Sequence, residues 1–258
     1  DAASKAHERI AAISVRKKTL LSENGFPADY LDVRYTCPDC KDTGYIGTEK
    51  CHCLKQRLID IRYFQSNIME KLSSENFDTF SFDYFDGEAL SEIKRAYNAS
   101  LDFTEKFASE YNNMLFYGNV GCGKTFLTNC IAKALLDKGF SVVYLSAFQL
   151  FAILNTHTFD SKNEDDDGRR NYDSLFVSDL LIIDDLGTEI MSSAVSSGFF
   201  QILNERGLRH RSTVISTNLS LGQLRDNYSE RSLSRILGNF SLYKFSGADI
   251  RIKKARKS

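Results

Sequence analysis

MLFYGNVGCGKT, residues 114–125, joins an apolar segment to a glycine-rich loop, and the helix-compatible FLTNCIAKALLDKG follows it. A GxxxxGKT pattern between a strand and a helix is typical of a phosphate-binding loop. The glycines let successive backbone N–H groups face phosphate oxygens, and the helix N-terminus adds the positive end of its dipole. The chain is therefore predicted to bind a nucleotide within an α/β fold.

Two side chains in this loop have expected chemical roles. Lys124 is expected to reach the β- and γ-phosphates, and Thr125 is expected to bind Mg²⁺. Cys122 and, farther along, Cys130 are interpreted as incidental small residues. The expected nucleotide-binding residues are Gly118, Asn119, Val120, Gly121, Cys122, Gly123, Lys124, Thr125 and Phe126.

Two later apolar segments also end in polar residues. In DLLIIDDLGTE, residues 179–189, a buried strand is predicted to present Asp184 to Mg²⁺ and Asp185 to the attacking water. In STVISTN, residues 212–218, the strand ends before Asn218, whose amide could face the γ-phosphate or hold that water. Because parallel strands end at one edge of a sheet, these residues are predicted to share a crevice with the loop.

Strand-like and helix-like segments alternate after residue 90, as expected for a parallel sheet with crossover helices. Helices fit between the predicted strands. The five expected strands are Met114–Tyr117, Val142–Ser146, Leu180–Asp184, Thr213–Thr217 and Leu242–Phe245.

Four of the six cysteines lie within YTCPDCKDTGYIGTEKCHCLKQRL, residues 35–58. Two short-spaced cysteine pairs can place four thiolates around one Zn²⁺ and so fold a segment that is too small to fold alone. The predicted structural zinc site consists of Cys37, Cys40, Cys51 and Cys53. The second pair is CxC, which leaves His52 as an alternative ligand.

The remaining N-terminal sequence predicts a helix and a linker. Residues 1–24 fit an amphipathic helix that ends at Asn24-Gly25, with either a partner or the next module against its apolar face. ENFDTFSFDYFDGE, residues 75–88, is expected to pack its aromatic rings on the following domain. The predicted organisation is a helical and zinc-binding module at 1–72, a linker at 73–89 and an ATPase domain at 90–258.

Composition excludes several classes of protein. The 258 residues are 42% hydrophobic, which excludes a disordered tail, and no apolar run approaches the roughly 20 residues of a membrane span. A cytoplasmic protein without membrane contact is expected. The net charge of −1 makes any nucleic-acid contact local rather than dependent on bulk charge.

The order of these motifs, with NYSERSLSRILGN at 227–239, resembles the AAA+ ATPases and among them the DnaC/DnaI-type replicative helicase loaders. The likeness covers residues 76–258, and the cysteine module is similar to the N-terminal part of some loaders. LLIIDDLGTE and ISTNLS are also similar to segments of the IstB transposition-helper ATPases.

The resemblance implies that Gly118–Thr125 is Walker A, that Asp184 and Asp185 are Walker B, and that Asn218 is sensor 1. It implies that Arg235, with Arg231 beside it, is an arginine finger acting on a neighbouring subunit. Arg251 falls where sensor 2 lies. The segment Ala147–Thr156 would face single-stranded DNA, with Phe148 as a candidate contact.

Two departures from the AAA+ pattern affect the expected activity. Asp185 stands where many AAA+ proteins have Glu, so slow hydrolysis stimulated by a partner or by DNA is expected, with Glu189 as a possible helper. The sequence ends soon after the fifth expected strand, so no helical lid is expected.

The resulting hypothesis is a loader that places a DnaB-type replicative helicase on single-stranded DNA. ATP and ADP, Mg²⁺ and Zn²⁺ are the expected cofactors, and ATP binding and hydrolysis would act as a conformational switch. The alternatives are an IstB-like ATPase that assists a transposase, a small-molecule kinase, and a zinc adaptor with vestigial nucleotide binding.

Overall fold

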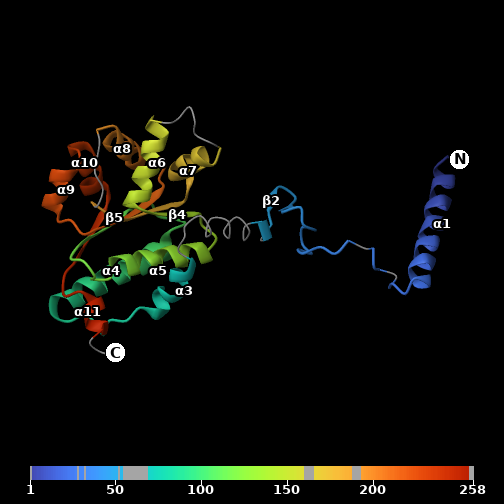
Figure 1. Ribbon diagram of the computed structural model, residues 1–258, viewed down its shortest axis with the longest axis horizontal. Coiled ribbons are helices and arrows are strands. Elements are labelled where there is room, and N and C mark those ends of the chain that lie inside the picture. The colour runs from blue at the N-terminus through green and yellow to red at the C-terminus, as the bar shows by residue number, and fades with distance from the viewer. Residues whose placement is uncertain are drawn as a thin grey trace. The chain divides into compact units, whose positions relative to one another are not determined.

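The computed structural model describes residues 2–27, 29–31, 33–51, 53–54, 69–159, 166–187 and 193–255. Two compact units make up the chain, Asp1–Leu54 and Lys55–Ser258. Figure 1 shows a helix and a small hairpin in the first unit and a sheet flanked by helices in the second.

The N-terminal unit begins with α1 (Ala2–Glu23). The helix ends as predicted, because Gly25 adopts a φ of +75° and the backbone N–H of Phe26 donates to the carbonyl of Leu21 at 2.9 Å. After the helix, β1 (Tyr45–Ile46) and β2 (Glu49–Lys50) pair antiparallel. One cysteine pair precedes β1 and the other follows β2, and the antiparallel pairing of the strands brings the two pairs together.

A five-stranded parallel sheet forms the centre of the second unit, in the order β4-β5-β6-β3-β7. All five strands occur where the sequence predicts them, each within two residues at either end. They are β3 (Met114–Gly118), β4 (Val142–Ser146), β5 (Leu180–Leu186), β6 (Ser212–Thr217) and β7 (Ser241–Phe245).

Helices cover both faces of this sheet (Figure 1). The strands alternate between two cores, so that Met114 and Phe116 pack on one side while Leu115 packs on the other. The first core contains residues of α3 (Met69–Ser74), α4 (Gly87–Lys106) and α5 (Lys124–Asp137). The second is formed largely with α6 (Ala147–Phe159), α7 (Asp166–Val177), α8 (Ser193–Leu208), α9 (Leu221–Asn227) and α10 (Glu230–Asn239).

The boundary between the units lies earlier than the sequence placed it. Leu72, assigned to the N-terminal module, has 1% exposure and belongs to the first core of the second unit. The expected linker at 73–89 contains the 3₁₀ helix η1 (Phe77–Thr79), and its aromatic rings pack on that core, as predicted for them. The division falls after Leu54, because α3 contacts α5 and so joins the sheet unit.

The final helix, α11 (Ile250–Ala255), follows β7 directly. Among the helices in the described ranges, none combines the length and apolar character needed to cross a bilayer.

Candidate functional site

The loop between β3 and α5 depends on glycine at two positions. Gly118 and Gly121 have φ values of +122° and +71°, which residues with a Cβ atom rarely adopt. A Cβ at Gly118 would lie 2.2 Å from the carbonyl oxygen of Phe245, and one at Gly121 would lie 2.1 Å from the carboxylate of Asp249. The loop therefore forms a tight cradle beneath the β7–α11 turn.

Lys124 is the first residue of α5, and the residue as a whole is buried, with 4% exposure. It donates hydrogen bonds to the carbonyl oxygens of Gly118 at 2.9 Å and Asn119 at 2.5 Å. Burial lowers the pKa of Lys124. A buried cation inside a glycine loop suits an incoming phosphate, whose oxygens would replace these carbonyl contacts.

Thr125 and Asp184 meet as the sequence predicts. The Thr125 hydroxyl donates to Oδ1 of Asp184 at 3.2 Å, and the Ser216 hydroxyl donates to the same oxygen through a short hydrogen bond. Burial raises the pKa of Asp184. A hydroxyl and a carboxylate oxygen side by side at a phosphate loop are the oxygen ligands that Mg²⁺ takes in nucleotide sites.

Asp185 and Asn218 form a second pair at the same sheet edge. The Asn218 amide donates to Oδ1 of Asp185 at 3.2 Å, and the backbone N–H of Asp185 donates to the Ser216 hydroxyl at 3.0 Å. Asp185 adopts a φ of +56°, which turns the chain sharply at the end of β5. The Asn218 amide, just after β6, thus holds the Asp185 carboxylate on the same side of the cavity.

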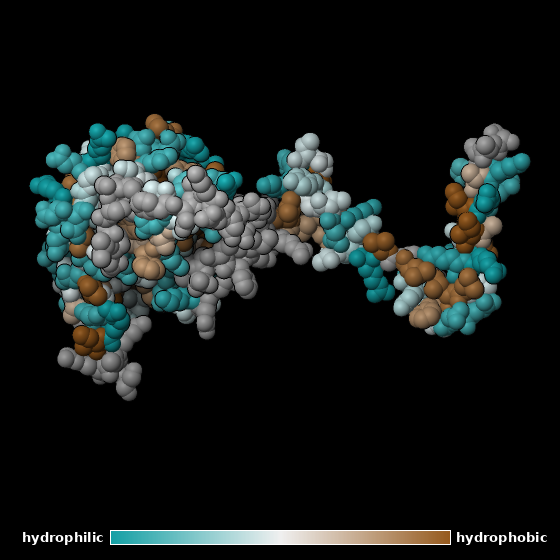
Figure 2. All heavy atoms as spheres, turned by 45° about the horizontal axis from the view of Figure 1, so that its top comes forward, coloured by the Kyte–Doolittle hydropathy of each residue, from teal (hydrophilic) through white to brown (hydrophobic). Residues whose placement is uncertain are grey.

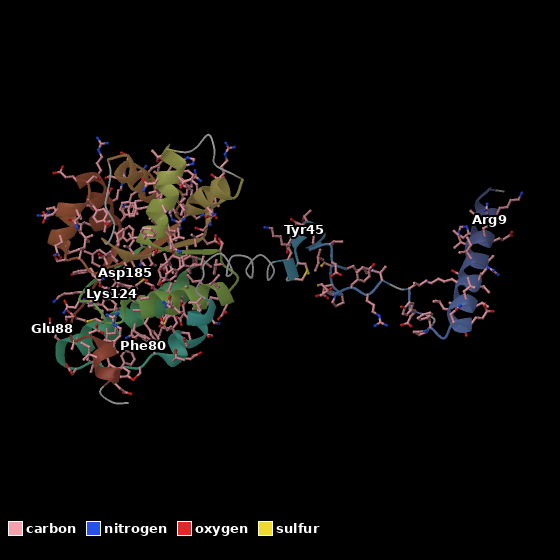
Figure 3. The ribbon with its side chains drawn as sticks, viewed as in Figure 1. Arg9, Tyr45, Phe80, Glu88, Lys124 and Asp185 are labelled. Atoms are coloured by element: carbon pink, nitrogen blue, oxygen red, sulfur yellow. The ribbon has the colours of Figure 1, made fainter. Side chains whose placement is uncertain are left out.

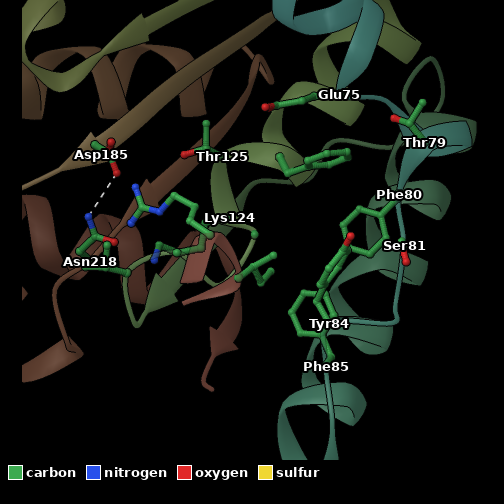
Figure 4. Close-up of a pocket in the computed structure, with 16 residues that line it drawn as sticks. Glu75, Thr79, Phe80, Ser81, Tyr84, Phe85, Lys124, Thr125, Asp185 and Asn218 are labelled. Carbon is green, nitrogen blue, oxygen red and sulfur yellow. Dashed lines mark hydrogen bonds between the residues drawn. The ribbon is translucent and has the colours of Figure 1, made fainter. Parts of the chain in front are cut away.

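A cavity of about 370 Å³ connects these groups (Figure 4), and three residues that line it, Phe80, Lys124 and Asp185, are labelled in Figure 3. Figure 4 shows Lys124, Thr125, Asp185 and Asn218 on one side and an aromatic wall on the other. That wall and its surroundings consist of Glu75, Thr79, Phe80, Ser81, Tyr84, Phe85, Val120, Phe126 and Ile250. An end that carries the Lys124 ammonium and the glycine loop, beside an aromatic end, fits the phosphates and the base of a nucleotide.

The aromatic wall was missed as part of the site by sequence reasoning. Residues 75–88 were predicted to pack their aromatic rings on the domain in preference to stacking on single-stranded nucleic acid, and six of them also line its cavity. The ring centroids of Phe80 and Phe126 lie 5.4 Å apart, which joins this segment to the first turn of α5. Phenylalanines recurring among acids, shortly before the phosphate loop, were the available signal.

The structure places the predicted arginines in two different locations. Arg251 lines the cavity and pairs with Asp249, with Nη2 2.7 Å from Oδ2. Arg231 and Arg235 lie exposed on α10, and the described lining of the cavity includes neither. Phe148, the candidate DNA contact, lies in α6 with 75% exposure.

The four cysteines of the N-terminal unit converge as predicted. Their sulfur atoms all lie within 4.8 Å of one another, and the Sγ–Sγ distances are 3.7 Å for Cys37–Cys51 and 3.3 Å for Cys40–Cys53. Tetrahedral zinc with Zn–S bonds of about 2.3 Å requires sulfurs roughly 3.8 Å apart. The donor set and its spacing therefore fit Zn²⁺. His52 and Glu189 lie outside the described residues.

Backbone hydrogen bonds support this cysteine cluster. The N–H of Gly44 donates to Sγ of Cys40 at 3.3 Å, and the N–H of Cys51 donates to the carbonyl of Gly44 at 2.8 Å. The Asp42 carboxylate accepts from the N–H of Cys37 at 2.8 Å. These contacts fix both cysteine pairs around the hairpin.

Comparison with known proteins gives one family match. The model of a family described as IstB-like ATP binding protein matches residues 57–258. Among curated relatives, the replicative helicase loader DnaC of Buchnera aphidicola subsp. Baizongia pistaciae is 30% identical over 147 residues, 57% of this chain and 59% of the relative. The chromosomal replication initiator protein DnaA of Aliarcobacter butzleri is 32% identical over 127 residues, 49% of this chain and 27% of the relative.

A solved structure extends the likeness to the fold. A crystal structure of the DnaC helicase loader covers 69% of this chain and 99% of its own, with a TM-score of 0.58 and 24% identity. This likeness confirms the expected α/β fold with a five-stranded parallel sheet. The chain spans 27% and 32% of the first two initiator proteins that it matches.

Proposed function

Since the chain belongs to the IstB-like ATP binding protein family, we propose that it is an ATPase that loads a replicative DNA helicase onto single-stranded DNA. The observation that carries the ATPase part is the convergence of three strand ends on one cavity. The loop after β3, the acids that end β5 and Asn218 after β6 all line or border it.

The geometry supports a division of work among these residues. Lys124 would neutralise the β- and γ-phosphates, and Thr125 with Asp184 would hold Mg²⁺, which supplies further charge neutralisation. Asp185 would orient the attacking water and accept its proton, while Asn218 would hold Asp185 in place. The Asp185 carboxylate reaches one methylene less far than the usual glutamate, which supports slow hydrolysis.

The loader function is supported by the similarity to DnaC and by the cysteine cluster. The transposition helpers in this family are the competing assignment, and their N-terminal region typically lacks such a cluster. We assign helicase binding to the N-terminal unit, residues 1–54, and single-stranded DNA binding to the ATPase unit, with the exposed Phe148 as one contact. The proposed helicase partner is of the DnaB type.

ATP would then act as an assembly switch. Arg231 and Arg235 are exposed on α10, outside the cavity of their own chain, so they are available to the cavity of a neighbouring copy. A ligand shifts such an equilibrium only by its differential affinity for the two states, here the assembled and the separated protein. Arginine from a neighbour would supply that difference for ATP.

Capture of the replicative helicase tests this proposal. The full chain, immobilised with Mg²⁺ and either ATP or ADP, is expected to retain the helicase of its own host. A variant with Ser in place of Cys37 and Cys40 is expected to lose retention while still binding ATP. Retention of a transposase instead of the helicase would favour the IstB-like alternative.

A further inference from the structure

The β7–α11 turn, residues 246–250, is attached to the phosphate loop at several points. The N–H of Ile250 donates to the carbonyl of Gly121 at 2.9 Å, and the Asn119 side-chain amide donates to the carbonyl of Gly247 at 3.2 Å. The Cys122 thiol also contacts the Gly247 carbonyl at 3.5 Å. The turn and the loop are therefore positioned together, and Cys122 is more than an incidental small residue.

The opposite side of the same turn is fixed by α4. The Glu92 carboxylate accepts from the N–H of Ser246 at 3.0 Å and from its hydroxyl at 2.6 Å. A Cβ at Gly247 would lie 3.1 Å from the Cβ of Ala89. The turn is thus held between α4 and the phosphate loop.

Asp249 holds Arg251 from this fixed turn. Oδ1 of Asp249 accepts from the backbone N–H of Arg251 at 2.9 Å and from its Nε at 3.0 Å, and Oδ2 accepts from Nη2 at 2.7 Å. One carboxylate thus caps the start of α11 and fixes the plane of the guanidinium. The side chain of Arg251 is 70% exposed, so without the contact to Asp249 it would sample many rotamers.

The held guanidinium lies within electrostatic range of the predicted catalytic residues. The ion pair with Asp249 and, more weakly, the charge of Asp185 raise the pKa of Arg251. Burial and, to a smaller extent, the charge of Arg251 lower the pKa of Lys124. Asp249 engages Nε and Nη2, and among the described residues no hydrogen bond is made by Nη1, whose donors can therefore face a phosphate.

We propose that Asp249 is a positioning residue of the nucleotide site, which holds Arg251 in the cavity and ties its position to that of Gly121 in the phosphate loop. This inference rests on the proposed ATPase function. Because Arg251 is already ordered before the nucleotide arrives, binding does not have to immobilise it. The resulting gain in affinity should be larger for ATP than for ADP, since the γ-phosphate brings additional charge to the site.

The variant that tests this role is Asp249→Asn. Asparagine is also a good helix N-cap and has the same shape, but it offers one acceptor oxygen and turns an NH₂ group toward the guanidinium. Asp137→Asn is the matched control, because it removes a carboxylate paired with Lys133 at the C-terminal end of α5. Arg251→Ala and the double variant Asp249→Asn/Arg251→Ala complete a cycle.

Calorimetric titration of each full-length variant with Mg²⁺–ATP and Mg²⁺–ADP measures the effect. We expect Asp249→Asn to weaken ATP binding about two- to twelvefold, the range for immobilising one rotamer-rich side chain, and to change ADP binding less. In the Arg251→Ala background, Asp249→Asn should leave the ratio of ATP to ADP affinity unchanged. Asp137→Asn should match the wild type.

Three outcomes would overturn the inference: unchanged or tighter ATP binding by Asp249→Asn, equal weakening of both nucleotides, or an effect that persists without Arg251. Equal weakening would indicate a structural role in shaping the loop. Failure of the wild-type chain to bind ATP would overturn the proposed function as well, which separates the two failures.

Discussion

Replacing Asp184 by Asn should stabilise the protein without its ligand and abolish the stabilisation that Mg²⁺–ATP confers. Asp184 is 8% exposed, lies beside Asp185 in the chain, and accepts hydrogen bonds from the hydroxyls of Thr125 and Ser216. Burial raises its pKa, so the folded state disfavours its charge. An asparagine oxygen can still accept from both hydroxyls, and the charge is gone.

The sign of the effect follows from proton linkage. A carboxyl whose pKa is higher in the folded than in the unfolded chain contributes stability when protonated, and that contribution is lost as the pH rises through the folded-state pKa. At pH 7.5 the charged Asp184 therefore costs stability. Removing a charge that serves function at the cost of stability should raise the free energy of unfolding by about 1 kcal/mol. For a unit of this size, that corresponds to a rise of about 2–4 °C in Tm.

With nucleotide present the order should reverse. A ligand at one hundred times its Kd stabilises the wild type by about 2.7 kcal/mol, which corresponds to about 5–11 °C. Asp184→Asn loses a proposed Mg²⁺ ligand, so Mg²⁺–ATP should stabilise this variant little. The two proteins should therefore exchange their order of Tm between EDTA and Mg²⁺–ATP.

Scanning calorimetry in EDTA and in Mg²⁺–ATP measures both arms, at pH 7.5 and at a lower pH. In EDTA the advantage of Asp184→Asn should shrink as the pH falls toward the folded-state pKa, because the wild type then becomes neutral as well. Asp102→Asn is the control, since it removes an exposed carboxylate paired with Lys106 on α4. Lower stability of Asp184→Asn in EDTA, or equal stabilisation by Mg²⁺–ATP, would refute the reasoning.

Three further predictions concern other parts of the chain. Elemental analysis should find one zinc per chain, and Cys40→Ser should lose it, because one ligand of four is removed; zinc retention by Cys40→Ser would contradict the assigned set. Leu72→Ala should lower the free energy of unfolding of the ATPase unit by about 2–5 kcal/mol, measured in urea, because the side chain is buried in its core; a change below about 0.5 kcal/mol would contradict its place in that core. Arg235→Ala should leave ATP affinity within about twofold and lower helicase-stimulated hydrolysis at least tenfold, since the residue is proposed to act in a neighbouring copy; wild-type turnover would remove that role.

The fold was predictable because its strands are short apolar runs with polar residues at their carboxyl ends. LLIIDD and VISTN carry the pattern of strands buried on both faces, and the structure aligns Ile183 with Ile215 in β5 and β6. The contacts of Thr125 with Asp184 and of Asp185 with Asn218 follow from that alignment. Spacing along the chain was therefore sufficient for the centre of the site.

Contacts between segments far apart in the sequence were not predictable in this way. Arg206 is fully buried and donates to the carbonyls of Leu175 and Ser212, yet a charged residue on a helix ordinarily indicates an exposed face. The seating of Asp249 against Gly121 also depends on how β7 aligns with β3. Local pattern carries no information about which distant backbone groups need a partner.

Two chain segments, one before the sheet in the sequence and one after it, line the cavity, so a bound nucleotide would contact both. Residues 75–85 precede the sheet in the chain and form the aromatic wall, while Ile250 and Arg251 follow it. A nucleotide that contacts both segments shifts their arrangement only as far as it binds one arrangement more tightly than another. The first segment continues in sequence toward the zinc-binding unit. The second leads into residues 251–258, where five of eight residues are basic. We therefore expect the nucleotide state to influence the segment that leads to the proposed helicase-binding unit and the basic C-terminal segment. Such local control would suit a protein whose net charge of −1 gives it little general attraction for DNA.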